Sequence, residues 1–103
     1  MIIYIAGAMT GHPDWNRAAF DKAEQELSDQ LHTVLSPASH IPLCNPDAIP
    51  HSGYMKISFA MIDCCVAVYM LNGWSESKGA QMERGYAINN GKVILYQSQE
   101  GAK

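Results

Sequence analysis

Apolar residues along the chain fall into two alternating patterns, short β-branched runs and stripes with helical spacing. The run from Ile2 to Ala6 is typical of a buried strand. A later stripe has apolar residues that recur every three or four positions: Phe20, Ala23, Leu27 and Leu31. The chain is therefore predicted to start with a strand and to continue with a helix from about Asn16 to Leu31, for which Asp14 or Asn16 is a suitable cap.

The same alternation continues toward the end of the chain. Strands are expected over His32 to Leu35, Cys65 to Leu71 and Lys92 to Tyr96, and helices over Tyr54 to Ile62 and Ala80 to Asn90. The stretch from Ser36 to Gly53 holds four of the five prolines, so it is predicted to be a long surface loop that forms a lid or a wall of a site. The tail after Gln97 is expected to be frayed.

Strands that alternate with helices favour right-handed crossovers, and hence a parallel sheet covered by helices on both faces. We expect a single α/β domain over residues 1–103, a small flavodoxin-like three-layer sandwich with a parallel sheet of roughly four to five strands. Such sheets bind ligands at the carboxyl ends of their strands, where the strand order reverses. This rule places the Gly7 to Gly11 loop, the end of the strand at Leu71 and the Gly73 to Gly79 loop around one crevice.

Composition narrows the possible partners. The chain of 103 residues is 48% hydrophobic and 17% charged, which suits one globular domain and excludes a disordered or fibrous protein. A formal net charge of −3 argues against binding to polymeric nucleic acid.

The strongly apolar run from Cys65 to Leu71 is far shorter than the roughly 18 residues of a membrane span. The N-terminus has the pattern of a strand and not of a secretory signal, so a cytoplasmic protein that does not enter a membrane is expected.

Cysteine and histidine spacing favours no metal site. The three cysteines, Cys44, Cys64 and Cys65, form no C-x-x-C pair, and we expect them to be reduced and buried. The four histidines, at positions 12, 32, 40 and 51, show no H-x-x-x-H spacing. The Gly7 to Gly11 loop lacks the pattern of a nucleotide phosphate loop, and its glycines are expected to allow close approach of a ligand. No cofactor or metal is predicted.

The densest chemical signal surrounds Glu83. A serine-glycine turn, Ser77 to Gly79, leads into a helix that carries Glu83 in its first turns. The positive end of the helix dipole favours the ionised carboxylate, so Glu83 is expected to be charged at neutral pH. A carboxylate can attack an anomeric carbon and hold a glycosyl ester, and free backbone amides at a helix start suit a phosphate. The alternative is an acidic residue that only stabilises its helix.

The pattern S-x-G-x-x-x-E-x-G-x-A from Ser77 to Ala87 resembles the nucleoside 2-deoxyribosyltransferase family and its relatives, the deoxynucleoside-monophosphate N-glycosidases. The segment Ile3 to Gly11 is similar to that family's first strand and glycine loop, and the Asn72 to Ala80 segment to a short branch common in bacteriophage genomes. The resemblance covers nearly the whole chain. It implies that Glu83 is the nucleophile and that Tyr4 supports it.

The same resemblance implies the groups that contact a substrate. Ser77 matches the serine that touches a 5′-phosphate in the nucleotide hydrolases, and Gly79 is expected to contribute to the same phosphate site. Gly7 and Met9, in the glycine loop, are predicted to line the substrate pocket. Trp74 either stacks on a nucleobase or packs over a helix end, and the same alternatives hold for Trp15.

One position departs from the family pattern. The family's catalytic or base-contacting aspartate, early in the second helix, falls at Ser58, and a serine cannot act as that general acid. Asp63 is the catalytic substitute that the sequence offers, although it can equally well cap a turn. The family's loop proline is also replaced, by Ala8.

Two functions follow from these residues. The first is an enzyme that cleaves or exchanges the N-glycosidic bond of a 2′-deoxynucleoside or its 5′-monophosphate, with Glu83, Tyr4 and Asp63 as catalytic residues. The alternative is a non-catalytic nucleotide sensor or sequestering protein on the same fold. A purely structural or interaction domain is less favoured, because the glutamate of the family pattern is present as Glu83. The family that the chain resembles closes its crevice with a neighbouring subunit, which implies a homodimer or larger assembly.

Overall fold

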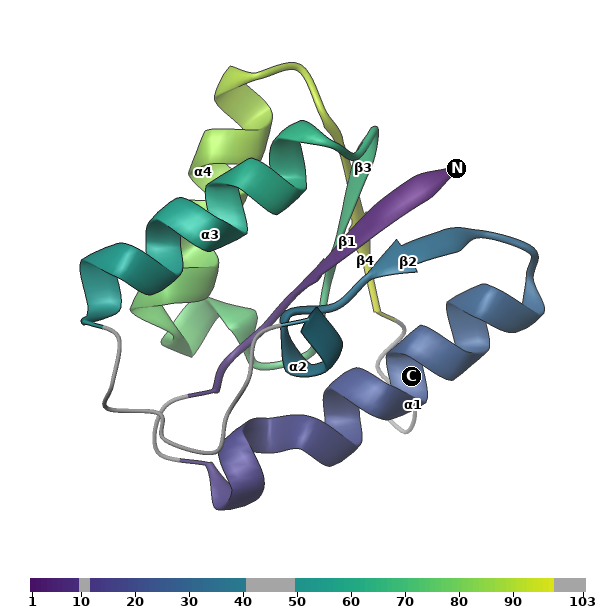
Figure 1. The fold of residues 1–103 in the computed structure, drawn as a ribbon, viewed down its shortest axis with the longest axis horizontal. Helices are drawn as coiled ribbons and strands as arrows, with labels where there is room; N and C mark the ends of the chain where they lie inside the picture. Colours follow the sequence, from purple (N-terminus) through teal and green to yellow (C-terminus); the bar gives the residue numbers. More distant parts are fainter. Residues whose placement is uncertain (10–11, 41–49, 98–103) are drawn as a thin grey trace.

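A computed structural model of the chain describes residues 1–9, 12–40 and 50–97 (Figure 1). Its regular elements are the strands β1 (Ile2–Ala6), β2 (Thr33–Leu35), β3 (Ala67–Met70) and β4 (Val93–Tyr96), and the helices α1 (Arg17–Asp29), α2 (Pro37–His40), α3 (His51–Asp63) and α4 (Lys78–Asn89). Short 3-10 turns lie over Pro13–Asn16 and Trp74–Glu76. The four described strands form one parallel sheet in the order β2-β1-β3-β4. The predicted flavodoxin-like α/β fold is confirmed.

Helices cover the two faces of the sheet in separate layers (Figure 1). Side chains of β1 alternate between the faces, as the period of a strand requires. Ile3 and Ile5 pack with Phe20 of α1 in one core cluster. Tyr4 belongs to the opposite cluster, together with Ile62 of α3 and residues of α4. The alternation along β1 therefore decides that the Tyr4 side chain faces α3 and α4.

The predicted loop from Ser36 to Gly53 is wrong at both ends. Pro37 starts the short helix α2, because the fixed φ of proline suits the first helical position. Pro50, in an extended conformation, precedes α3, which begins at His51 and so extends the predicted helix backward by one turn. Residues 41–49 between them, including Cys44, lie outside the described residues, as do Thr10, Gly11 and the tail from position 98.

The start and end of α1 also differ from the prediction. Asn16 occupies the N-cap position in a left-handed conformation (φ 62°), yet neither it nor Asp14 caps the helix through its side chain. The Asn16 side-chain amide instead donates a hydrogen bond to the carbonyl oxygen of Ala8 at 2.8 Å, which ties the helix to the loop after β1. The helix ends at Asp29, so Leu31, with φ 69°, is 92% exposed and lies outside the core.

The two described cysteines differ in burial. Cys65 is buried as predicted, whereas Cys64, at the end of α3, is exposed. Among the described residues, no helix has the length and apolar character needed to cross a membrane.

Gly7 is required by packing against the neighbouring strand end, and the close approach of a ligand to this loop stays a prediction. A Cβ at this position would lie 2.8 Å from Cδ1 of Leu71, which is itself fully buried after β3. Gly85, inside α4, has nothing within 4 Å of the position that its Cβ would take.

The two glycines lead to opposite predictions for substitution by alanine. Gly7→Ala should lower the free energy of unfolding by about 1–3 kcal/mol, because Leu71 must shift in a filled core. Gly85→Ala should raise it by about 0.5–1 kcal/mol, because alanine restricts the unfolded chain and favours the helix. Urea unfolding of both variants checks the pair, and equal effects of the same sign would contradict this interpretation of Gly7.

Candidate functional site

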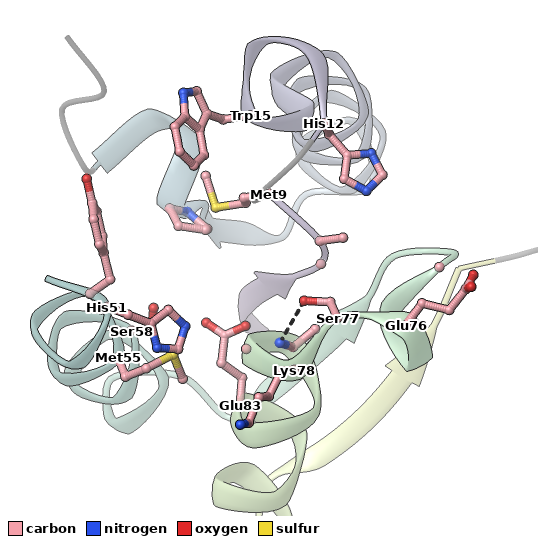
Figure 2. Close-up of a pocket in the computed structure, with 17 residues that line it drawn as sticks. Met9, His12, Trp15, His51, Met55, Ser58, Glu76, Ser77, Lys78 and Glu83 are labelled. Carbon is pink, nitrogen blue, oxygen red and sulfur yellow. Dashed lines mark hydrogen bonds between the residues drawn. The ribbon is translucent and has the colours of Figure 1, made fainter. Parts of the chain in front are cut away.

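A pocket of about 570 Å³ opens at the carboxyl ends of β1 and β3 (Figure 2). This is the point at which the strand order reverses, since the chain passes from β1 outward to β2 and from β3 outward to β4. The loop after β1, the turn after β3, the start of α4 and one face of α3 line the pocket. The expectation that these loops surround one crevice is therefore confirmed for the described residues.

A hydrogen-bonded pair of buried polar side chains forms the floor of the pocket. The hydroxyl of Tyr4 donates to Oε2 of Glu83 at 2.6 Å, joining β1 to α4 across 79 positions of sequence. Tyr4 is fully buried, while Glu83 is 7% exposed and lines the pocket. Ser58, on α3, is 6% exposed and also hydrogen-bonds to the pair through its hydroxyl. Three elements thus meet at one carboxylate.

Burial controls the charge state of Glu83. Loss of solvent raises the pKa of Glu83 to about 7, although hydrogen bonds from Tyr4 and Ser58 favour the charged form and act in the opposite direction. The expectation of a carboxylate fully ionised at neutral pH is therefore wrong. The helix dipole was expected to favour the charged form of Glu83. However, Glu83 lies beyond the first turn of α4, where the effect of the dipole is largely lost. Burial also raises the pKa of Tyr4, with the nearby Glu83 adding to the effect, so the phenol stays a donor.

The start of α4 forms the polar side of the pocket. Ser77 is the N-cap of the helix, and its Oγ accepts a hydrogen bond from the backbone N–H of Ala80 at 3.2 Å. Ser77, Lys78 and Gly79 all line the pocket. An amino group, a hydroxyl and the first amides of a helix at one place suit an anionic group.

The side opposite Glu83 is largely apolar. Figure 2 shows Met9 and Trp15 across the pocket from the Glu83 carboxylate. Pro37 of α2 and Tyr54 of α3 also line the pocket. Flat and apolar groups facing a polar floor suit a ligand with an aromatic part and a polar part.

Two residues predicted for the site lie elsewhere. Asp63 is at the far end of α3, where its Oδ1 accepts a hydrogen bond from the hydroxyl of Tyr86 at 2.7 Å. Trp74 is half-buried, lies under the Arg84 guanidinium at 5.0 Å and is tilted against the ring of Tyr96 at 6.0 Å. Neither Asp63 nor Trp74 is among the residues that line the pocket. Asp63 therefore joins α3 to α4, and Trp74 packs between Arg84 of α4 and Tyr96 of β4.

The other predicted site residues meet at the pocket. These are Glu83, Gly7, Met9, Ser77 and Gly79, with Tyr4 hydrogen-bonded to Glu83 from below. His51 was missed as a site residue because the prolines before it suggested a loop and hid the first turn of α3, and Tyr54 was missed although it starts the predicted helix. The spacing His51, Met55 and Ser58, at i, i+4 and i+7, was the available signal, since it places the three on one helix face. Among the described residues, no group of acidic, histidine and cysteine side chains is arranged to hold a metal ion.

Comparison with known proteins identifies a family without a named activity. The family described as "Domain of unknown function (DUF4406)" matches residues 1–96 of the chain. A search of curated proteins found no match. The match covers every described strand and helix and all the residues that line the pocket.

The raised pKa of Glu83 leads to a prediction about stability and pH. The native carboxyl binds a proton up to about pH 7, whereas in the unfolded chain its pKa is near the ordinary 4.5, so the native state holds more protons between these values. The free energy of unfolding should therefore fall as pH rises through this window, by about 3 kcal/mol in total for this group. Glu83→Gln, which is neutral throughout, should be progressively more stable than the wild type from pH 5 to pH 8.

Urea unfolding at several pH values measures this difference. Glu76→Gln is a matched control, because Glu76 lines the same pocket but is exposed, and this variant should follow the wild-type curve. Parallel curves for the wild type and Glu83→Gln would show that Glu83 is not held in its neutral form by burial.

Proposed function

The chain belongs to the DUF4406 family, and we propose that its pocket cleaves or exchanges the N-glycosidic bond of a 2′-deoxynucleoside or its 5′-monophosphate. The observation that carries the proposal is the buried Tyr4–Glu83 hydrogen bond of 2.6 Å at the floor of an open pocket. The resemblance to nucleoside 2-deoxyribosyltransferases assigns these same two residues to the nucleophile and its support.

Glu83 has the properties that a carboxylate nucleophile needs. With its pKa raised to about 7, a large fraction of the group is ionised at neutral pH, and little water surrounds its oxygens. Tyr4 and Ser58 hold the carboxylate from two different elements, so that its orientation is fixed before a substrate arrives. One oxygen of Glu83 attacks C1′ as the bond to the base breaks, which gives a deoxyribosyl ester. Water or a second base then attacks C1′ and releases Glu83.

The two sides of the pocket suit the two ends of a nucleotide. A phosphate at Ser77 and Lys78 would be held by the start of α4. The deoxyribose then lies over Glu83, five to six residues further along the chain, and the base extends toward the first turn of α3, where Tyr54 lines the pocket. A pocket of about 570 Å³ is large enough for a nucleoside monophosphate.

The alternative is a protein that binds nucleotides without cleaving them. It is favoured by the position of Asp63 outside the pocket and by the serine at position 58, because neither of these two positions supplies a carboxylic acid to the pocket. In that case Glu83 accepts hydrogen bonds from the sugar, and the start of α4 binds the phosphate. The homodimer and the cytoplasmic location expected from the sequence stay predictions.

Release of free base tests the proposal directly. Deoxynucleosides and their 5′-monophosphates are incubated with the protein, and free base is separated by chromatography. The wild type should release base, and Glu83→Gln should lower kcat/KM by at least about a thousandfold, because the amide cannot form the ester. Acid quenching followed by mass spectrometry should find a deoxyribosyl adduct on the wild type only. If no base appears and a nucleotide still raises the Tm, the binding alternative holds.

Tyr4→Phe separates support of the nucleophile from binding. The hydrogen bond from Tyr4 favours the ionised form of Glu83, so its loss should raise the pKa of Glu83 further. The rise of kcat/KM with pH should then move to higher pH, and kcat/KM at pH 7 should fall about tenfold. A pH profile of base release measures the shift. A uniform loss at every pH would indicate a role of Tyr4 in packing alone.

A further inference from the structure

We propose that His51 is the group that delivers a proton to the departing nucleobase. This inference rests on the proposed function and deepens it, because neither the sequence nor the family match assigns a proton donor within the pocket. Cleavage of an N-glycosidic bond places an electron pair on a base nitrogen, and protonation of the base stabilises that charge as it forms. The donor must therefore lie in the pocket on the side of the base.

The helix α3 carries His51 to the pocket. His51, Met55 and Ser58 are spaced so that they share one helix face, and all three line the pocket. Met55 and Ser58 are buried, whereas His51, at the first position of α3, is exposed at the pocket mouth. Burial of Met55 and Ser58 orients this face of α3 toward the pocket. The exposed His51 imidazole can therefore reach a ligand and exchange protons with water.

The imidazole lies close to the helix that carries the nucleophile. Nε2 of His51 is 3.6 Å from the position that a Cβ of Gly79 would occupy. Gly79 and Glu83 are four residues apart in α4 and therefore lie on the same helix face, one turn from each other. Figure 2 shows the imidazole entering the pocket from α3 on the side of the Glu83 carboxylate. A sugar over Glu83 thus places its base beside His51.

Other ionisable groups that line the pocket are less well placed. Lys78 and Glu76 come from the turn and helix start that form the polar side. His12 comes from the loop after β1, and Figure 2 shows it on the opposite side of the pocket from His51. Ser58 is beside Glu83, but a hydroxyl is too weak an acid for the role. Histidine is the residue that most often transfers protons in enzymes near neutral pH.

The proton and the electrons balance over the two half-reactions. As Glu83 bonds to C1′, the C1′–N bond breaks, its electron pair goes to the base, and the His51 imidazolium gives its proton to the base. His51 is then neutral. In the second half-reaction it takes a proton from the attacking water, or from a second base, while the ester bond to Glu83 breaks and the carboxylate is restored.

A substrate that needs no proton isolates this role. In 7-methyl-2′-deoxyguanosine 5′-monophosphate the methylated base already carries a positive charge and leaves as a neutral molecule. His51→Gln should slow release of base from the common 2′-deoxynucleoside 5′-monophosphates by about 10²–10⁴-fold. Its effect on the methylated compound should be less than about tenfold, because binding and the nucleophile are intact. His51→Ala should regain activity on the unmethylated substrates when imidazole is added to the buffer.

Two further variants make the outcomes distinct. Glu83→Gln should lose activity on both kinds of substrate, and His12→Gln should keep the wild-type ratio between them. If the wild type releases base but His51→Gln equals it, or loses both substrates equally without rescue by imidazole, the role of His51 is overturned while the proposed function stands. If the wild type releases base from no substrate, the proposed function fails. Thermal unfolding of the two His51 variants should give a Tm near that of the wild type, since His51 is exposed.

Discussion

The arrangement of the pocket depends on one buried hydrogen bond, from the hydroxyl of Tyr4 to the carboxylate of Glu83. A buried carboxyl group that lacked partners would be costly in free energy, and here the partners come from the central strand and from α3. The bond also ties α4 to the sheet at Glu83. Ala80 and Ala87 of the same helix pack in the core cluster that contains Tyr4. The polar contact and the apolar packing thus specify the same position for the helix.

The elements predicted from the sequence were those determined by local periodicity. A β-branched apolar run in β1, helical spacing in α1 and the alternation of strands and helices gave the fold class, whereas the pairing of Tyr4 with Glu83 was implied by the family resemblance. Boundaries were less reliable where proline was involved. Proline suggested a loop before position 54, although it equally suits the residue before a helix or its first turn, and α2 and α3 use it in those ways.

Side-chain chemistry was predicted less well, because it depends on distances between elements. The sequence contained Asp63 and could not show that Tyr86, on another helix, would bind it away from the pocket. It contained Trp74 and could not show that Arg84 and Tyr96 would hold it in a packing role. The charge of Glu83 was misjudged for a related reason. A helix dipole can be anticipated from a single segment, whereas desolvation depends on what the rest of the chain places around the carboxyl group.

Position 58 holds a serine where the family resemblance implies an aspartate, and this difference affects the groups around Glu83. A carboxyl group there would lie next to Glu83, and two carboxylates at close range oppose each other's ionisation. A serine avoids this repulsion and donates to Glu83, so it favours the charged nucleophile instead of competing with it. Under the proposed function, the proton comes from the same helix face, where His51 lies two turns away at the mouth of the pocket. Under the proposed function, a serine at position 58 and a histidine at position 51 form one arrangement, in which the buried middle of α3 supports Glu83 and its exposed first residue transfers the proton.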